Sequence, residues 1–171
     1  MTVLATKRLT LRIPEPRDLE PFVGFVSRDR SKWVGGPGPR ADAAEGFNEN
    51  LTHWQDHGFG YFHVEVTLTG DAIGRVGLRR SGHRPEPEIA YSLYADEHQG
   101  HGYATEAAIA VRDWAYDVLG LDTVVSYVDP ANQPSRAVAE RMGARPDGTA
   151  EGWGKHPDLI VYRHLAPAAR T

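Results

Sequence analysis

Gln99-Gly100-His101-Gly102-Tyr103-Ala104 separates two segments with different patterns. Residues 88–94 begin after the breaker Pro87 and are predicted to form a strand. Residues 104–119 are rich in alanine, have helical spacing and end at Gly120, which is typical of a helix C-terminus. The glycines therefore open a helix, where unpaired N–H groups and a partial positive charge favour a phosphate. Because glycines also precede helices in ordinary turns, their spacing alone leaves a turn as an equal alternative.

A second motif follows the next predicted strand. Asn132-Gln133-Pro134-Ser135 opens a short helix over residues 135–142, which Gly143 closes. Asn132 stands near the start of this helix, where asparagine often caps the first turn. Its spacing is therefore compatible with either a cap or a ligand contact.

The rest of the chain predicts a mixed α/β fold. Strands are predicted over residues 8–13, 60–68, 72–79, 88–94, 123–128 and 159–162, and helices over 15–28, 41–56, 104–119 and 135–142. The order β-α-α-β-β-β-α-β-α-β, with room for one more terminal strand, combines an antiparallel meander with crossover helices. This order alone names no function.

The composition limits the classes of protein and of chemistry. The 171 residues, 40% hydrophobic and 25% charged, predict one soluble domain over residues 1–171, with a cytoplasmic location. The absence of cysteine excludes disulfides and a cysteine nucleophile. A net charge of -4 with scattered Lys and Arg argues against nucleic-acid binding, and no apolar stretch is long enough to span a membrane.

Gln99-x-x-Gly102-x-Ala104, followed by Asn132-x-x-Ser135 and Met142-Gly143, resembles the GNAT superfamily of acetyl-CoA-dependent N-acetyltransferases, in particular its RimJ/RimL-like branch. The resemblance extends, in the family's order, to residues 6–12, 73–78, 88–93, 100–107 and 161–163. It implies a mostly antiparallel, splayed mixed sheet of about seven strands flanked by about four helices. The activity it implies is direct transfer of an acetyl group to a primary amine, on a protein N-terminus or a small molecule, in a ternary complex.

The resemblance also implies where acetyl-CoA binds. The cofactor would lie between the strand that ends at Tyr94 and the strand that ends at Val128, with its diphosphate on the glycine motif. Backbone groups released by the splayed strands would pair with the pantetheine amides and hold the thioester oxygen. The implied cofactor-binding residues are Leu93, Tyr94, Ala95, Gln99, Gly100, His101, Gly102, Tyr103, Ala104 and Asn132. No metal is implied.

Two residues are candidates for proton transfer, which direct attack by an amine requires. Glu88 stands where the family often places the base that deprotonates the amine, although an exposed acid beside Glu86 is an equal alternative. Many members carry a tyrosine as the acid on the later helix, but the matching residue here is Ala139, which leaves Ser135 as the candidate donor. Ser135 can equally contact backbone N–H groups. Ala144 also replaces the usual phenylalanine after Met-Gly.

The amine acceptor would meet residues 33–54 and 150–157, which build the acceptor surface in the family. Trp33, Trp54 and Trp153 suit a cationic or peptide-like amine, although they can also be packing residues. The expected partner is this amine acceptor, and the sequence is also compatible with a homodimer. Neither nucleic acid nor a membrane is expected.

Two other functions fit part of the sequence. Gly100-x-Gly102 is two thirds of a dinucleotide-binding fingerprint and Asp129 ends the following strand, but Thr105 replaces the third glycine. A CoA-binding regulatory module without turnover would carry the same motifs. His53 and His57 lack the glutamate of a zincin motif, so a zinc site is disfavoured.

Overall fold

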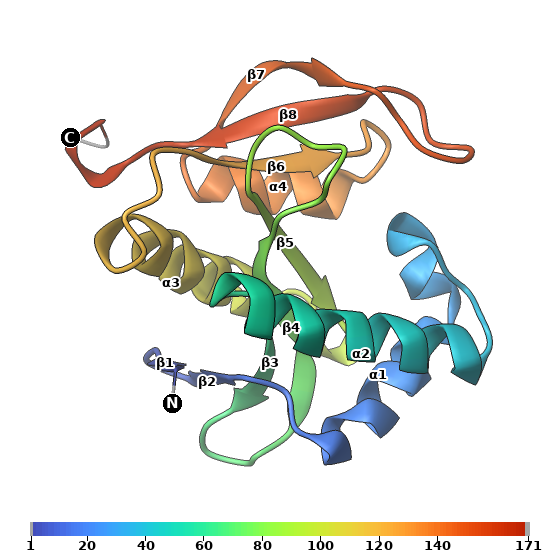
Figure 1. The fold of residues 1–171 in the computed structure, drawn as a ribbon. Helices are drawn as coiled ribbons and strands as arrows, with labels where there is room; N and C mark the ends of the chain where they lie inside the picture. The colour runs from blue at the N-terminus through green and yellow to red at the C-terminus, as the bar shows by residue number, and fades with distance from the viewer. Residues whose placement is uncertain (1, 170–171) are drawn as a thin grey trace.

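The computed structural model describes residues 2–169 and contains one eight-stranded sheet (Figure 1). The strands are β1 (Val3–Ala5), β2 (Leu9–Arg12), β3 (Tyr61–Val66), β4 (Ala72–Arg79), β5 (Glu88–Leu93), β6 (Val124–Val128), β7 (Arg145–Ala150) and β8 (Leu159–His164). Their order is β1-β2-β3-β4-β5-β6-β8-β7. All neighbours are antiparallel except β5 and β6. This mixed sheet confirms the expected fold and excludes the parallel, doubly wound sheet of a dinucleotide-binding fold.

Four α-helices and several short 3-10 turns complete the fold. They are α1 (Leu19–Val26), α2 (Arg40–His57), α3 (Tyr103–Asp117) and α4 (Gln133–Arg141), with 3-10 turns at Pro16–Asp18, Asp29–Val34, Asp96–His98 and Pro167–Ala169. In the part of the chain that the structure describes, none of the helices has the length and apolar character needed to cross a membrane.

Three elements differ from the sequence prediction. The sequence does not predict the strand β1, because its three residues are too few to show the alternation of polar and apolar side chains typical of a strand. The strand β7 was not predicted because it contains Pro146 and Gly148, is mostly exposed and pairs irregularly with β8. The predicted helix over residues 15–28 is divided into the 3-10 turn at Pro16–Asp18 and the shorter helix α1.

The core has two main parts, one for each group of helices. The larger packs α3 against the sheet through residues such as Val111, Phe62 and Val76. The smaller joins α1 and α2 to the end of β5 and contains Phe22, Phe25, Ala43, Phe47 and Tyr94. Because side chains alternate along a strand, β4 directs Val76 into the α3 core, whereas Arg75 lies under Phe22 of α1.

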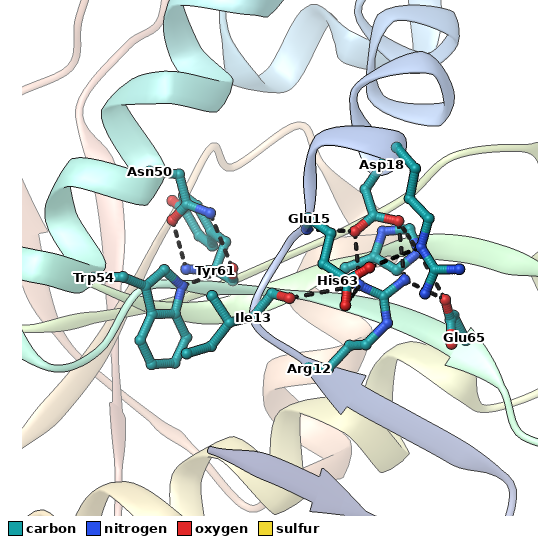
Figure 2. A network of polar contacts seen from close by, with 10 residues as sticks. Arg12, Ile13, Glu15, Asp18, Asn50, Trp54, Tyr61, His63 and Glu65 are labelled. Atoms are coloured by element: carbon teal, nitrogen blue, oxygen red, sulfur yellow. Dashed lines mark hydrogen bonds and ion pairs between the residues drawn. The ribbon is translucent and has the colours of Figure 1, made fainter. Parts of the chain in front are cut away.

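A buried polar network ties β2 and β3 to the start of α1 (Figure 2). The guanidinium of Arg12 donates to both carboxylate oxygens of Asp18, at 2.7 and 2.9 Å, and to Glu65 at 2.5 Å. His63 Nε2 lies 3.4 Å from both acids. Burial would raise the pKa of Asp18, but hydrogen bonds from Arg12 and the Glu15 backbone outweigh it and hold this pKa below its ordinary value. Asp18, His63 and Glu65 are close enough to hold a metal ion, but Arg12 already supplies the positive charge between the carboxylates.

A second polar contact in Figure 2 fixes the first residue of β3. Asn50 of α2 accepts a hydrogen bond from the Tyr61 N–H at 2.8 Å and donates to the Tyr61 carbonyl at 3.0 Å. The indole N–H of Trp54 donates to the same carbonyl at 3.1 Å. The backbone of Tyr61 is therefore fixed in place by α2.

The Arg12 network predicts a measurable stability effect for Asp18→Asn. Removing the Asp18 carboxylate leaves the Arg12 guanidinium with Glu65 as its remaining close acid and should lower the free energy of unfolding by about 2 kcal/mol. Glu20→Gln is the matched control, because Glu20 pairs with Arg40 on the surface and should cost much less. Urea unfolding at neutral pH measures both variants, and equal losses would contradict the structural role of the network.

Candidate functional site

The strands β5 and β6 touch at one point and then separate. Their only paired residues within the described chain are Glu88 and Val125, and the Val125 N–H donates to the Pro87 carbonyl at 3.0 Å. Ser126 Oγ then donates to the Ile89 carbonyl at 2.6 Å. Beyond this contact the strands border a groove of about 1560 Å³, lined also by the starts of α3 and α4.

The backbone of β5 faces this groove at alternate residues. The Tyr94 N–H donates to the Ile73 carbonyl of β4. On the other side of the strand, the Ile89 carbonyl accepts a hydrogen bond from Ser126, and the Leu93 carbonyl accepts one from Arg30. In an antiparallel ladder, the N–H and C=O groups of successive residues point alternately to the two edges of the strand. Tyr91 and Leu93 therefore direct their N–H and C=O groups away from β4, toward β6.

This geometry corrects one cofactor prediction on β5. Leu93 and Ala95 line the groove as expected. Tyr94 does not, because its N–H belongs to the β4 ladder and its ring packs against Phe25 at a centroid distance of 5.3 Å. Tyr91, which the sequence analysis did not single out, lines the groove in its place.

The glycine motif forms a turn at the start of α3. Gly100 and Gly102 have φ angles of 77° and 78°, a region that other residues adopt only with strain, and Gly102 is the N-cap of α3. The motif residues that line the groove are Gln99, Gly100, Gly102, Tyr103 and Ala104. His101 turns away, since its imidazole contacts the Glu97 carbonyl at 3.1 Å and stacks on Tyr103. Its side chain is therefore not part of the groove wall.

Asn132 and Ser135 line the opposite wall, at the start of α4. Asn132 Oδ1 accepts the Ser135 N–H at 3.3 Å, so Asn132 caps the helix as well as facing the groove. Across the groove, the Tyr91 hydroxyl donates to the Ser135 carbonyl at 2.8 Å, and Ser135 Oγ lies 3.4 Å from that hydroxyl. The side chain of Tyr91 thus joins β5 to α4.

Glu88 lines the groove at the point where β5 and β6 separate. Burial raises the pKa of Glu88 to about 7, against the opposing effects of Arg79, Arg84 and a backbone hydrogen bond from Tyr127. A carboxyl with this pKa exists in both forms at neutral pH, which is the property required of a general base.

The expected acceptor residues separate into two groups. Trp33 and Trp153 line the groove and flank His156, at ring-centroid distances of 6.2 and 4.2 Å. His156 Nδ1 lies 2.6 Å from the buried carboxylate of Asp129. Trp54 is a correction: it is only 7% exposed and packs in the core against Phe62, so it cannot contact an acceptor in the groove.

Comparison with known proteins agrees with this architecture. The family described as "Acetyltransferase (GNAT) domain" matches residues 8–145. The chain belongs to the GNAT acetyltransferase family.

Individual proteins are similar over nearly the whole chain. A crystal structure of an acetyltransferase from Agrobacterium tumefaciens is 38% identical with a TM-score of 0.87, covering 97% of this chain and 95% of that one. "Uncharacterized protein YkkB" of Bacillus subtilis is 29% identical and covers 94% of each chain. "Putative ribosomal N-acetyltransferase YdaF" of the same organism is 26% identical and covers 96% of this chain and 94% of its own. The protein is thus a GNAT acetyltransferase whose relatives include the RimJ/RimL-like type.

Proposed function

We propose that residues 1–171 form one N-acetyltransferase domain that moves an acetyl group from acetyl-CoA to a primary amine by direct transfer in a ternary complex. The observation that carries this proposal is the separation of β5 from β6 beside the glycine turn. The groove is large enough for both substrates, and residues from both walls face it. The chain has no cysteine that could carry the acetyl group as a thioester intermediate, which favours transfer in one step.

The groove residues fit the chemical groups of acetyl-CoA. The backbone of Tyr91 and Leu93 faces the gap and can pair with amides, as another strand would. The first N–H groups of α3, exposed by Gly100 and Gly102, suit a diphosphate. Asn132 lies on the opposite wall and can contact the pantetheine arm.

Glu88 and Ser135 are proposed to move the protons. The amine nitrogen bonds to the carbonyl carbon while the carbon–sulfur bond breaks, and the amine proton passes to Glu88, directly or through water. Ser135 Oγ passes its proton to the thiolate that leaves and regains a proton from water, to which Glu88 releases the amine proton. Both side chains line the same groove, and the pKa of Glu88 near 7 suits a base.

The cofactor assignment predicts that Gly102→Leu weakens CoA binding. A side chain at this φ strains the turn that presents the first N–H groups of α3, and its Cβ would lie 3.5 Å from Arg8 Nη2, so the dissociation constant for CoA should rise about tenfold or more, a loss of at least about 1.4 kcal/mol. Gly120→Leu is the control, because Gly120 also has a positive φ, of 65°, but does not line the groove. Isothermal titration with CoA measures both, and equal affinities in the two variants would disprove the assignment.

The proton-transfer assignment predicts a pH effect for Glu88→Gln. In the parent enzyme kcat should rise with pH through about 7 as the carboxylate forms. The variant should lose this rise and about 10²–10⁴-fold in kcat, with nearly constant CoA affinity. Ser135→Ala should cost less, because a thiolate leaves readily without an acid.

Glu86→Gln is the control for the pH profile. Glu86 is two residues from Glu88, but it pairs with Arg163 and Thr123 and does not line the groove. Its profile should match that of the parent enzyme. A parental profile in Glu88→Gln would place the base elsewhere.

A further inference from the structure

The groove wall around Glu88 carries two arginines that are not held in ion pairs within the described chain. Arg79 faces Glu88 across β4 and β5, and Arg75 lies four residues, or two pleat repeats, further along β4, opposite Ser92. Within residues 2–169, neither Arg75 nor Arg79 forms an ion pair, although both line the groove. Arg12 and Arg163, in contrast, pair with three and two acids, respectively.

Arg75 is held rigidly in this wall. Its guanidinium carbon lies 4.6 Å from the centre of the Phe22 ring and 4.5 Å from that of Tyr61, so the group is clamped between two aromatic faces. Its Nε is buried without a hydrogen-bond partner. Asn50 and Trp54 fix the Tyr61 backbone in turn (Figure 2). A fixed, partly desolvated guanidinium with no acid beside it is pre-organised to bind an anion.

Two grooves meet at this arginine. A smaller pocket of about 410 Å³, between α2 and the end of β4, shares Tyr61, Arg75 and Arg79 with the main groove. A molecule with its amine at Glu88 could therefore place a second group at Arg75. The opposite charges of Glu88 and Arg75 suit an acceptor that carries both an amine and an acid.

The surrounding loops favour a small acceptor. Trp33, in the 3-10 turn after α1, contacts His156 in the β7–β8 loop. Arg84, in the β4–β5 loop, donates to the Glu151 carbonyl at 2.8 Å. The three loops thus contact one another at the acceptor end of the groove, which restricts the room for a polypeptide.

We propose that the acceptor is a small amine that also carries a carboxylate, the class that includes free amino acids, and that Arg75 binds this carboxylate while Glu88 meets the amine. This inference rests on the proposed function and narrows its acceptor class. Arg79 lies beside Glu88 and adds positive charge at the same wall. The acetyl transfer itself is unchanged: a carbon–nitrogen bond forms, the carbon–sulfur bond breaks and the amine proton passes to Glu88.

The experiment compares free amino acids with their C-terminal amides, which keep the side chain and lose the negative charge. Release of the CoA thiol gives kcat/KM for each. Since a hydrogen-bonded charge contributes about 1.5–3 kcal/mol, the acids should exceed the amides by about 10- to 100-fold. In Arg75→Gln this ratio should fall to about one, and Arg75→Lys should retain part of it. Arg145→Gln, an exposed arginine away from the groove, should keep the full ratio.

The wild-type comparison needs no variant and therefore stays decisive if Arg75→Gln does not fold. Two results would overturn the carboxylate inference and leave acetyl transfer intact. One is a kcat/KM ratio of acids to amides near one, and the other is a preference for cationic amines or short peptides over free amino acids. If no amine of any kind supported release of the CoA thiol, the proposed function itself would be overturned.

Discussion

The groove exists because β5 and β6 are joined at a single residue pair and then separate. A continuous sheet would pair every backbone group of these strands, but pairing stops after Glu88 and Val125. The backbone groups of β5 that point away from β4 beyond this point face the groove, where water or a ligand can supply polar partners. An extended ligand with its own amides can take this place, which is why we propose the opening in the sheet as the binding site.

Polar side chains hold the two halves of the sheet at this opening. Ser126 Oγ contacts both the Ile89 carbonyl and His164 Nε2, at 2.6 and 2.8 Å. Burial lowers the pKa of His164 to about 4, so its ring is neutral at physiological pH. Arg163 of β8 pairs with Glu86 in the loop before β5. These contacts cluster near the closed end, and the Tyr91 hydroxyl spans the groove to Ser135 further along. The width of the groove is thus set by specific contacts on both sides.

The sequence predicts the helix starts better than the strands at the sheet's edges. Gly102 and Asn132 mark α3 and α4 because capping requires particular residues at particular positions. The short strand β1 and the irregular strand β7 have no comparable local signal and depend on their neighbours for pairing.

The groove residues show the same division. Leu93 and Gly102, expected from the sequence to bind the cofactor, both line the groove, because their place follows from the chain direction. Trp54 and Tyr94 do not line it, because a helical stripe or a strand end does not reveal which side faces the core. His156 could not be found from sequence, since its contact with Asp129 joins a loop to a distant strand end.

A crystal structure of the protein with bound CoA would show directly whether the gap between β5 and β6 holds the cofactor. We expect the pantetheine arm to lie between β5 and β6, with its amides hydrogen-bonded to the backbone of Tyr91 or Leu93 and its diphosphate on the first N–H groups of α3. Glu88 and Val125 should remain the last paired residues of the two strands. CoA bound outside this gap, or β5 and β6 paired along their length in the complex, would contradict the account.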